Sequence, residues 1–328
     1  MAYESNCSFL WRVAGVQGVE VGFLLDELGD GPAGQRALQP HLAEVFLSGA
    51  AADRLARMLA VPPVRLRWAL PHLREAHLLS GEQARWEWPW QPPAHYLVPA
   101  CGLCAAARGG HWGEVWLIWP ERWKICDRHG RFTHVRQDGP GGVDLARLPE
   151  AVDAHRRRGR LERRYGPAGA ALVADAFAVT GWWWRRAPAT RRWTDRAGRG
   201  GLEPRKIETG WLLVYPEALR VARALLRYEQ QRADRAGGSW PSAEAELAAE
   251  LSQLAGELGL PPGRWQVPVA EWLARHHTCA PAAGAVEGRG RRRGRRPVTA
   301  LVRHGEESPA SLGHCCLPWD WSDPFTAV

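Results

Sequence analysis

The sequence predicts a mainly α-helical protein with one small, metal-stabilised β unit. Apolar residues recur at helical spacing over most of the chain. Two pairs of soft metal ligands, each with a two-residue spacing, flank a short run of β-branched and aromatic residues. We therefore expect a helix-turn-helix-like N-terminal region over residues 1–92, a zinc-ribbon unit over 93–140, a helical C-terminal region over 141–279 and a disordered basic tail over 280–328.

The two ligand pairs are Cys101 with Cys104, and Cys126 with His129. A two-residue spacing directs both side chains of a pair at one ion from a single tight turn. Three cysteines and one histidine form the closed tetrahedral set typical of structural zinc, because a catalytic zinc keeps one position open for water. We expect one structural Zn²⁺ per chain, with His111 as an alternative to His129 for the fourth ligand.

A short hairpin is expected between the two pairs. Val115–Trp119 is a β-branched and aromatic run, Pro120 ends it, and Trp123–Ile125 leads into the second pair. Such a hairpin would bring the two pairs together. Gly130 follows the second pair and allows the tight turn that this pair requires.

Two helical pairs are predicted before the zinc unit. The first covers residues 7–29 and is broken at Gly18; the second covers residues 50–78 and is broken at Pro62. Each is compatible with a helix-turn-helix or with an ordinary helical hairpin, and the sequence does not choose the recognition helix. The second pair carries more arginines, which favours it for phosphate contacts. The candidate DNA-binding residues there are Arg54, Arg57, Arg65 and Arg67.

The C-terminal region is predicted to be helical from about residue 145, with a polar, Gly-rich loop over 187–210 and further helices over 215–228, 243–258 and 269–276. Its first helical stretch has a dense arginine cluster that suits either phosphate binding or a solvated helix face. The candidate DNA-binding residues of this cluster are Arg156, Arg157, Arg158, Arg160, Arg163 and Arg164.

The formal net charge is +8, and the positive excess is clustered in runs, which is typical of proteins that bind phosphate backbones. The Gly/Arg run at 289–297 cannot pack a core and suits non-specific contacts with duplex DNA. Its candidate residues are Arg291, Arg292, Arg293, Arg295 and Arg296. A second metal site is a further hypothesis for His276, His277, Cys279, His314, Cys315 and Cys316.

Several functional classes are disfavoured. The sequence has no P-loop, no H-E-x-x-H and no G-x-S-x-G motif, so we expect a binding protein and not an enzyme. It has no run of 18 or more apolar residues and no signal-peptide pattern at its N-terminus. We expect a cytoplasmic protein without a membrane partner.

The order of these parts resembles the TniQ family, the target-selection proteins of certain bacterial transposons. The resemblance covers about the first 140 residues and continues more loosely to about residue 195. Gly102 and Asp127 stand where the family commonly has proline. The matching residues are Glu4-Ser5, Ser8–Ala14, Gly18-Val19, the Leu55–Leu73 helical pair, Cys101-x2-Cys104, Trp116-Leu117 with Pro120, and Cys126-x2-His129-Gly130.

The resemblance implies a DNA-binding target-site selector or adaptor in DNA transposition, which recruits an ATPase and a transposase encoded elsewhere. The alternative is a domesticated, zinc-containing protein-docking scaffold or transcription regulator with only weak, non-specific DNA binding. The salt dependence of DNA binding separates the two hypotheses. The sequence does not indicate the oligomeric state.

Overall fold

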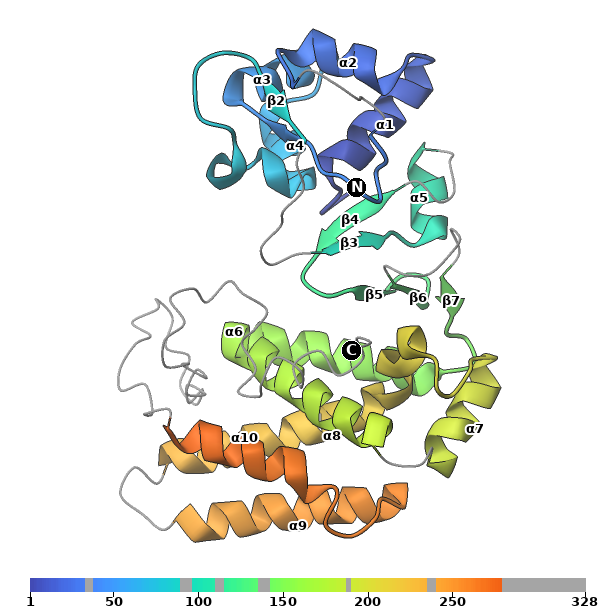
Figure 1. The fold of residues 1–328 in the computed structure, drawn as a ribbon, viewed down its shortest axis with the longest axis vertical. Coiled ribbons are helices and arrows are strands. Elements are labelled where there is room, and N and C mark those ends of the chain that lie inside the picture. The colour runs from blue at the N-terminus through green and yellow to red at the C-terminus, as the bar shows by residue number, and fades with distance from the viewer. Residues whose placement is uncertain are drawn as a thin grey trace. The chain divides into compact units, whose positions relative to one another are not determined.

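The computed structural model describes residues 1–32, 38–88, 96–109, 115–134, 142–186, 190–234 and 240–278. It is mainly helical with small antiparallel sheets, which confirms the predicted fold class at this level. The chain forms two compact units, an N-terminal unit (Met1–Asp144) and a C-terminal unit (Leu145–Val328), whose elements are labelled in Figure 1. Among the described residues, no helix combines the length and the apolar character needed to cross a membrane.

Helices α1 (Asn6–Gln17) and α2 (Val21–Leu28) form the first predicted helical pair. The Ser5 side chain accepts a hydrogen bond from the backbone N–H of Ser8 at 3.1 Å and caps the start of α1. Gly18 ends α1 in the left-handed conformation (φ 68°), which glycine adopts without steric strain.

Helices α3 (Gly49–Met58) and α4 (Pro63–Ala69) form the second pair. The helix predicted to continue towards residue 78 ends earlier, at Ala69. Leu70 precedes a proline, which disfavours helical geometry, and adopts φ −113° and ψ 100°. Two short 3₁₀ turns, η1 (Pro71–Leu73) and η2 (Glu75–His77), follow.

The core of this part of the N-terminal unit joins all four helices. Leu10 of α1, Leu25 of α2, Leu55 of α3 and Leu66 of α4 belong to one buried cluster. Strands β1 (Phe46–Leu47) and β2 (Trp86–Glu87) pair antiparallel, and the Trp86 side chain is buried in the same cluster. The four helices therefore share one buried core.

Strand pairing around the ligand pairs differs from the prediction. β4 (Trp116–Trp119) pairs with β3 (Tyr96–Pro99), and β5 (Trp123–Cys126) pairs with β6 (Arg131–His134), so the hairpin expected between 115–119 and 123–125 is wrong. The edge of β4 away from β3 is occupied by the N-terminal segment through a bridge between Glu4 and Leu117. Helix α5 (Gly102–Gly109) and strand β7 (Val143–Asp144) complete this region.

The C-terminal unit consists of long helices: α6 (Pro149–Arg186), α7 (Arg191–Gly200), α8 (Ile207–Asp234), α9 (Trp240–Leu258) and α10 (Gln266–Thr278). Helix α8 packs against α6, α7 and α9, and α10 packs against α6 (Figure 1). Helix α6 is kinked at Gly166, whose φ of 60° and ψ of −141° are outside the helical region.

The prediction of a loop over residues 187–210 is wrong for its middle part, because residues 191–200 form α7. Thr190 caps the helix by accepting a hydrogen bond from the backbone N–H of Trp193, and Gly201 ends it in the left-handed conformation. Trp193, Arg196 and Ala197 are buried at helical spacing. The polar composition misled the prediction because it gives no sign that Arg196 is buried against a carboxylate from another helix.

Candidate metal centre

The two ligand pairs lie at the ends of regular elements. Cys101 follows β3 and directly precedes α5, and Cys104 lies in the first turn of α5. Cys126 ends β5, and His129 lies in the turn to β6. That turn closes through a 2.8 Å hydrogen bond from the backbone N–H of Gly130 to the carbonyl of Cys126, with Gly130 at φ 58°.

The four potential ligand atoms converge on one point. All lie within 4.8 Å of one another. His129 Nδ1 is 3.5 Å from Cys101 Sγ, 3.2 Å from Cys104 Sγ and 3.7 Å from Cys126 Sγ. The Sγ atoms of Cys104 and Cys126 are 3.6 Å apart. These side chains could hold one metal ion, with His129 as the fourth ligand among the described residues. His111 lies outside the described residues.

The electrostatics of the cluster favour a bound cation. Burial raises the pKa of the Cys101 thiol, and the nearby Cys126 adds to this effect. Burial together with the hydrogen bond to Cys126 raises the pKa of Cys104 to about 12. Several thiolates in one small volume repel one another, whereas a metal cation compensates their charge and takes up the deprotonated form.

Contacts between the two small sheets support the cluster. The Trp123 and Phe132 rings stack with centroids 5.8 Å apart inside the β5–β6 hairpin. The Lys124 ammonium lies 3.2 Å from the centroid of the Trp119 ring on β4, and the Arg122 guanidinium lies 4.9 Å from that of Tyr96 on β3. The sheet that leads into the first ligand pair is thus held against the sheet that presents the second.

The β3–β4 sheet also holds the start of the chain. The Ser5 backbone N–H donates to the Trp116 carbonyl at 2.9 Å, and the Ile118 backbone N–H donates to the Tyr3 carbonyl at 2.7 Å. The Trp116 backbone N–H donates to Ser8 Oγ at 2.9 Å. Because Ser5 caps α1 and Ser8 lies in its first turn, β4 connects the metal cluster to the helical core of the same unit.

The arginine candidates of the N-terminal unit are exposed on α3 and α4. Their guanidinium groups make no ion pair with any residue that the structure describes, so their charge faces solvent. Arg57 donates only to the backbone carbonyl of Asp53, at 3.4 Å. The four residues are Arg54, Arg57, Arg65 and Arg67.

The arginine cluster on α6 is divided by its contacts. Arg157 forms an ion pair with Asp153, and Arg158 pairs with Glu162 at 2.6 Å. Arg164 lies over the ring of its neighbour Tyr165, 5.1 Å from the centroid. The remaining candidates on this helix are exposed, namely Arg156, Arg160 and Arg163.

The remaining candidates belong to the end of the chain. The tail candidates Arg291, Arg292, Arg293, Arg295 and Arg296 lie outside the described residues, as does the tail predicted to be disordered. Of the second metal-site hypothesis, Cys279, His314, Cys315 and Cys316 also lie outside them, and the side chains of His276 and His277 on α10 are not described.

Two residues on α4 were missed as functional candidates, because only its arginines were considered for binding. Val64 and Trp68 are both largely exposed although both are large and apolar. The sequence shows only that the two residues are four positions apart and therefore share one helix face; that this face lies opposite the buried Leu66 is known from the structure.

Comparisons with protein-family models, with curated proteins and with solved structures give no match to this chain. The functional argument therefore rests on the ligand cluster and on the exposed side chains of α3 and α4.

Proposed function

We propose that this chain is a zinc-stabilised DNA-binding protein that acts as a target-site selector or adaptor in DNA transposition. The observation that carries the DNA-binding part is the group of four exposed arginines on α3 and α4 without acidic partners among the described residues. Guanidinium groups presented in this way can neutralise backbone phosphates and fix the position of a protein on a duplex.

Zinc is the metal that fits the cluster best. For a tetrahedral ion with Zn–S bonds of ~2.3 Å and a Zn–N bond of ~2.05 Å, two sulfurs lie about 3.8 Å apart and a sulfur and a nitrogen about 3.6 Å apart. The observed separations of 3.6 Å between Cys104 and Cys126 and of 3.2 to 3.7 Å from His129 Nδ1 are close to these edges. Four protein ligands leave no open position, which supports a structural role.

The proposed role of the zinc is to support the DNA-binding helices. The ion would lock the β5–β6 turn onto the segment that joins β3 to α5. Strand β4, paired with β3, holds Tyr3 and Ser5 ahead of α1. Helix α1 shares one buried cluster with α3 and α4. Loss of the metal would thus loosen the support of the helices that carry the arginines.

The DNA-binding part is tested with the full chain and a fluorescent duplex at ~50 and ~200 mM salt. If Arg54, Arg57, Arg65 and Arg67 each neutralise one phosphate, replacing all four by alanine reduces the slope of log K against log salt by about 3.6. The wild-type chain should then lose about 150-fold more affinity than this variant over the same salt range.

A matched control removes the same positive charge elsewhere. Arg191, Arg199, Arg220 and Arg227 in the C-terminal unit each pair with an acidic residue. Their replacement by alanine should leave the salt slope nearly unchanged. Equal slopes for the two quadruple variants would show that net charge alone drives binding. No duplex binding by the wild-type chain would favour the docking-scaffold alternative.

The transposition part rests on the resemblance to the TniQ family described above. Its test is reconstitution of integration with a transposition ATPase and a transposase added to the assay. Addition of the wild-type chain should concentrate insertions near a site that it binds, and the four-arginine variant should not. Insertions distributed alike with and without the chain would contradict an adaptor role.

A further inference from the structure

The outward face of α4 combines apolar and basic side chains in a regular arrangement. Leu66 is 5% exposed, whereas Val64 is 71% and Trp68 69% exposed. With a rotation of about 100° per residue, Val64 and Trp68 lie side by side directly opposite Leu66. Arg65 and Arg67 lie on either side of them. We call this arrangement of Val64, Arg65, Arg67 and Trp68 the α4 ridge.

The apolar part of the α4 ridge is not explained by folding. Tryptophan is usually mostly buried, and two exposed large apolar side chains on one helix face are typical of a binding surface and not of a solvated face. Leu66, with the partly buried Ala69, packs α4 against the core, and Val64 to Trp68 apart from Leu66 remain exposed to a partner.

The connection between α3 and α4 presents this ridge to solvent. The turn covers residues 59–62, the length typical of a helix-turn-helix, and Ala60 adopts the left-handed conformation at φ 50°. Pro62 and Pro63 restrict the backbone at the start of α4. The turn and the proline pair thus fix the direction of α4 relative to α3.

Resting on the proposed DNA binding, we infer that α4 is the base-reading helix and that it reads thymine. The major groove is about 12 Å wide and admits one helix. In it, Val64 and Trp68 would face the base edges, where the thymine C5-methyl group is the apolar contact, while Arg65 and Arg67 reach the phosphates of the two flanking strands.

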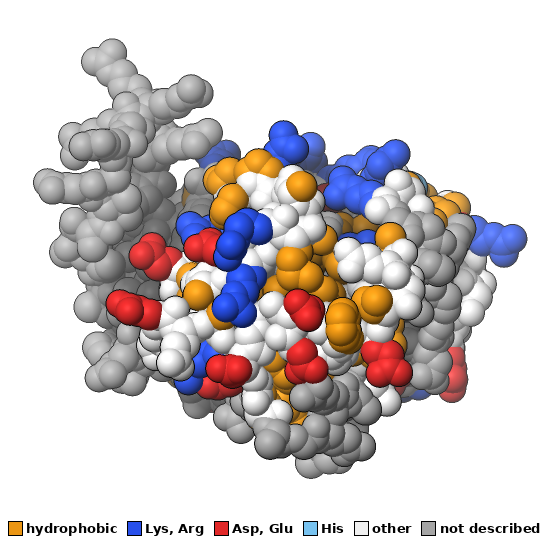
Figure 2. All heavy atoms as spheres, turned by 90° about the horizontal axis from the view of Figure 1, so that it is seen from above, with side chains coloured by type: hydrophobic (Ala, Val, Ile, Leu, Met, Phe, Trp, Pro, Cys, Tyr) orange, Lys and Arg blue, Asp and Glu red, His pale blue; other side chains and the backbone are white. Residues whose placement is uncertain are grey.

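Charge complementarity selects α4 over the other candidate helix, α2. Helix α2 also exposes an aromatic side chain, Phe23, at 59%. Its other exposed positions are Asp26 and Glu27, which would repel phosphates. On the face drawn in Figure 2, most Lys and Arg side chains lie in the upper half and most Asp and Glu side chains in the lower half, with apolar side chains exposed between them.

The test uses the full chain with its metal and a randomised duplex pool. Repeated selection yields a preferred duplex, and affinities are measured for that duplex, for a scrambled one, and for a copy with 2′-deoxyuridine in place of each thymine. The uracil copy lacks only the C5-methyl groups. Trp68→Ala and Val64→Ala test the ridge, and Phe23→Ala is the matched control for removal of an exposed apolar side chain.

For the wild-type chain, the preferred duplex should bind about 5 to 100-fold more tightly than its uracil copy. Trp68→Ala should lose a similar factor on the preferred duplex, change little on the scrambled one, and no longer distinguish thymine from uracil. Phe23→Ala should match the wild type. All substituted positions are exposed, so the variants should keep their melting temperature and metal content. If Trp68→Ala loses either, Trp68→Gln is used in its place.

The outcomes separate this inference from the proposed function. Salt-sensitive binding together with wild-type discrimination in Trp68→Ala and Val64→Ala would overturn the assignment of α4 and leave DNA binding standing. A pool without sequence preference would also overturn it. No duplex binding at all would refute both the base-reading role of α4 and the proposed DNA binding, and would favour a protein partner for the α4 ridge.

Discussion

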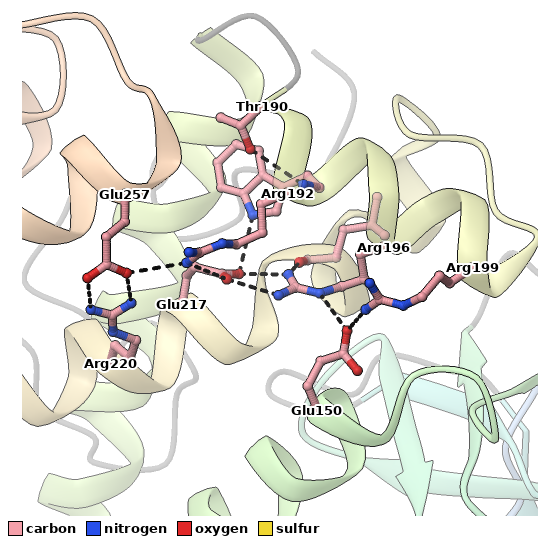
Figure 3. A network of polar contacts seen from close by, with 10 residues as sticks. Glu150, Thr190, Arg192, Arg196, Arg199, Glu217, Arg220 and Glu257 are labelled. Carbon is pink, nitrogen blue, oxygen red and sulfur yellow. Dashed lines mark hydrogen bonds and ion pairs between the residues drawn. The ribbon is translucent and has the colours of Figure 1, made fainter.

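Arg196 and Glu217 form a buried, two-pronged ion pair in the C-terminal unit (Figure 3). Arg196 Nη1 lies 2.7 Å from Glu217 Oε2, and Nη2 lies 2.9 Å from Oε1. Burial by itself would lower the pKa of Arg196, but the hydrogen bond and charge of Glu217 outweigh it and the pKa is raised. The pair links α7 to α8, and Trp193 Nε1 donates to the same carboxylate at 3.2 Å.

We predict that breaking this pair destabilises the C-terminal unit strongly. Glu217→Gln leaves the buried Arg196 charge with Glu150, 3.3 Å from Nε, as its one remaining acidic partner among the described residues, and should lower the free energy of unfolding by about 3 kcal/mol in urea denaturation. Arg227→Ala, which removes an exposed pair with Glu250, should lower it by less than about 1 kcal/mol. Equal losses in the two variants would contradict this account.

A second prediction concerns Glu44, a buried carboxylate at the start of α1. It accepts hydrogen bonds from the backbone N–H of Asn6 at 3.2 Å and of Cys7 at 2.9 Å, and it lies 3.1 Å from His72 Nδ1. Glu44→Ala leaves two helix-terminal N–H groups buried without acceptors, so thermal unfolding should show a loss of about 2–4 kcal/mol. Glu20, the N-cap of α2, caps no N–H with its side chain. Glu20→Ala should therefore change stability little, and a comparable loss there would refute the capping role.

The features that the sequence predicted correctly depend on residues close together in the chain. The ligand pairs have a two-residue spacing, and α1 to α3 follow from apolar periodicity and from breaks such as Gly18. The four potential metal ligands are thus identifiable from the sequence alone. The two-residue spacing identifies each ligand pair because the two ligands of a pair lie within one turn of the chain.

The features that escaped prediction depend on distant partners. The β4 strand pairs with β3 and with the N-terminal segment, and no residue between 115 and 125 indicates these pairing partners. Helix α7 has the polar composition of a loop. The burial of Arg196 in it depends on Glu217, which lies on another helix and pairs with it, and the local sequence does not show this pairing. Exposure of Trp68 is likewise a tertiary property, since periodicity alone does not show which side of α4 the core covers.

A third prediction concerns pH and Glu257. The hydrogen bond and charge of Arg220, with a contribution from Arg192, lower the pKa of Glu257 to about 2 from its ordinary value of 4.5. Since the folded-state pKa is the lower one, this carboxylate stabilises the fold fully above pH 4.5, and the stabilisation is lost as the pH falls towards 2. Glu257→Gln should be less stable than the wild type near neutral pH, with a difference that shrinks between pH 4.5 and 2. A difference that stays constant over this range would contradict the assignment.

A fourth prediction concerns metal content. Cys126→Ser removes one sulfur from a four-ligand set and should lose one equivalent of zinc per chain relative to the wild type, measured by elemental analysis of purified protein. Cys7→Ser is the matched control, because Cys7 is buried in the α1–α4 core and not among the four ligands. Retention of the full metal equivalent in Cys126→Ser would refute the ligand assignment.

The last prediction separates the two kinds of cysteine in the N-terminal unit by their reactivity. Metal coordination should protect Cys104 and Cys126 from alkylation, so a chelator should expose both. Cys7 is protected differently: burial, with a contribution from the charge of Glu44, raises its pKa to about 12, and the α1–α4 core encloses it. Peptide mapping after alkylation should show Cys104 and Cys126 modified quickly only with chelator, and Cys7 modified slowly in both conditions. Rapid modification of Cys7 on chelation would mean that the helical core does not survive metal loss, and unchanged protection of Cys104 would mean that no metal had protected it.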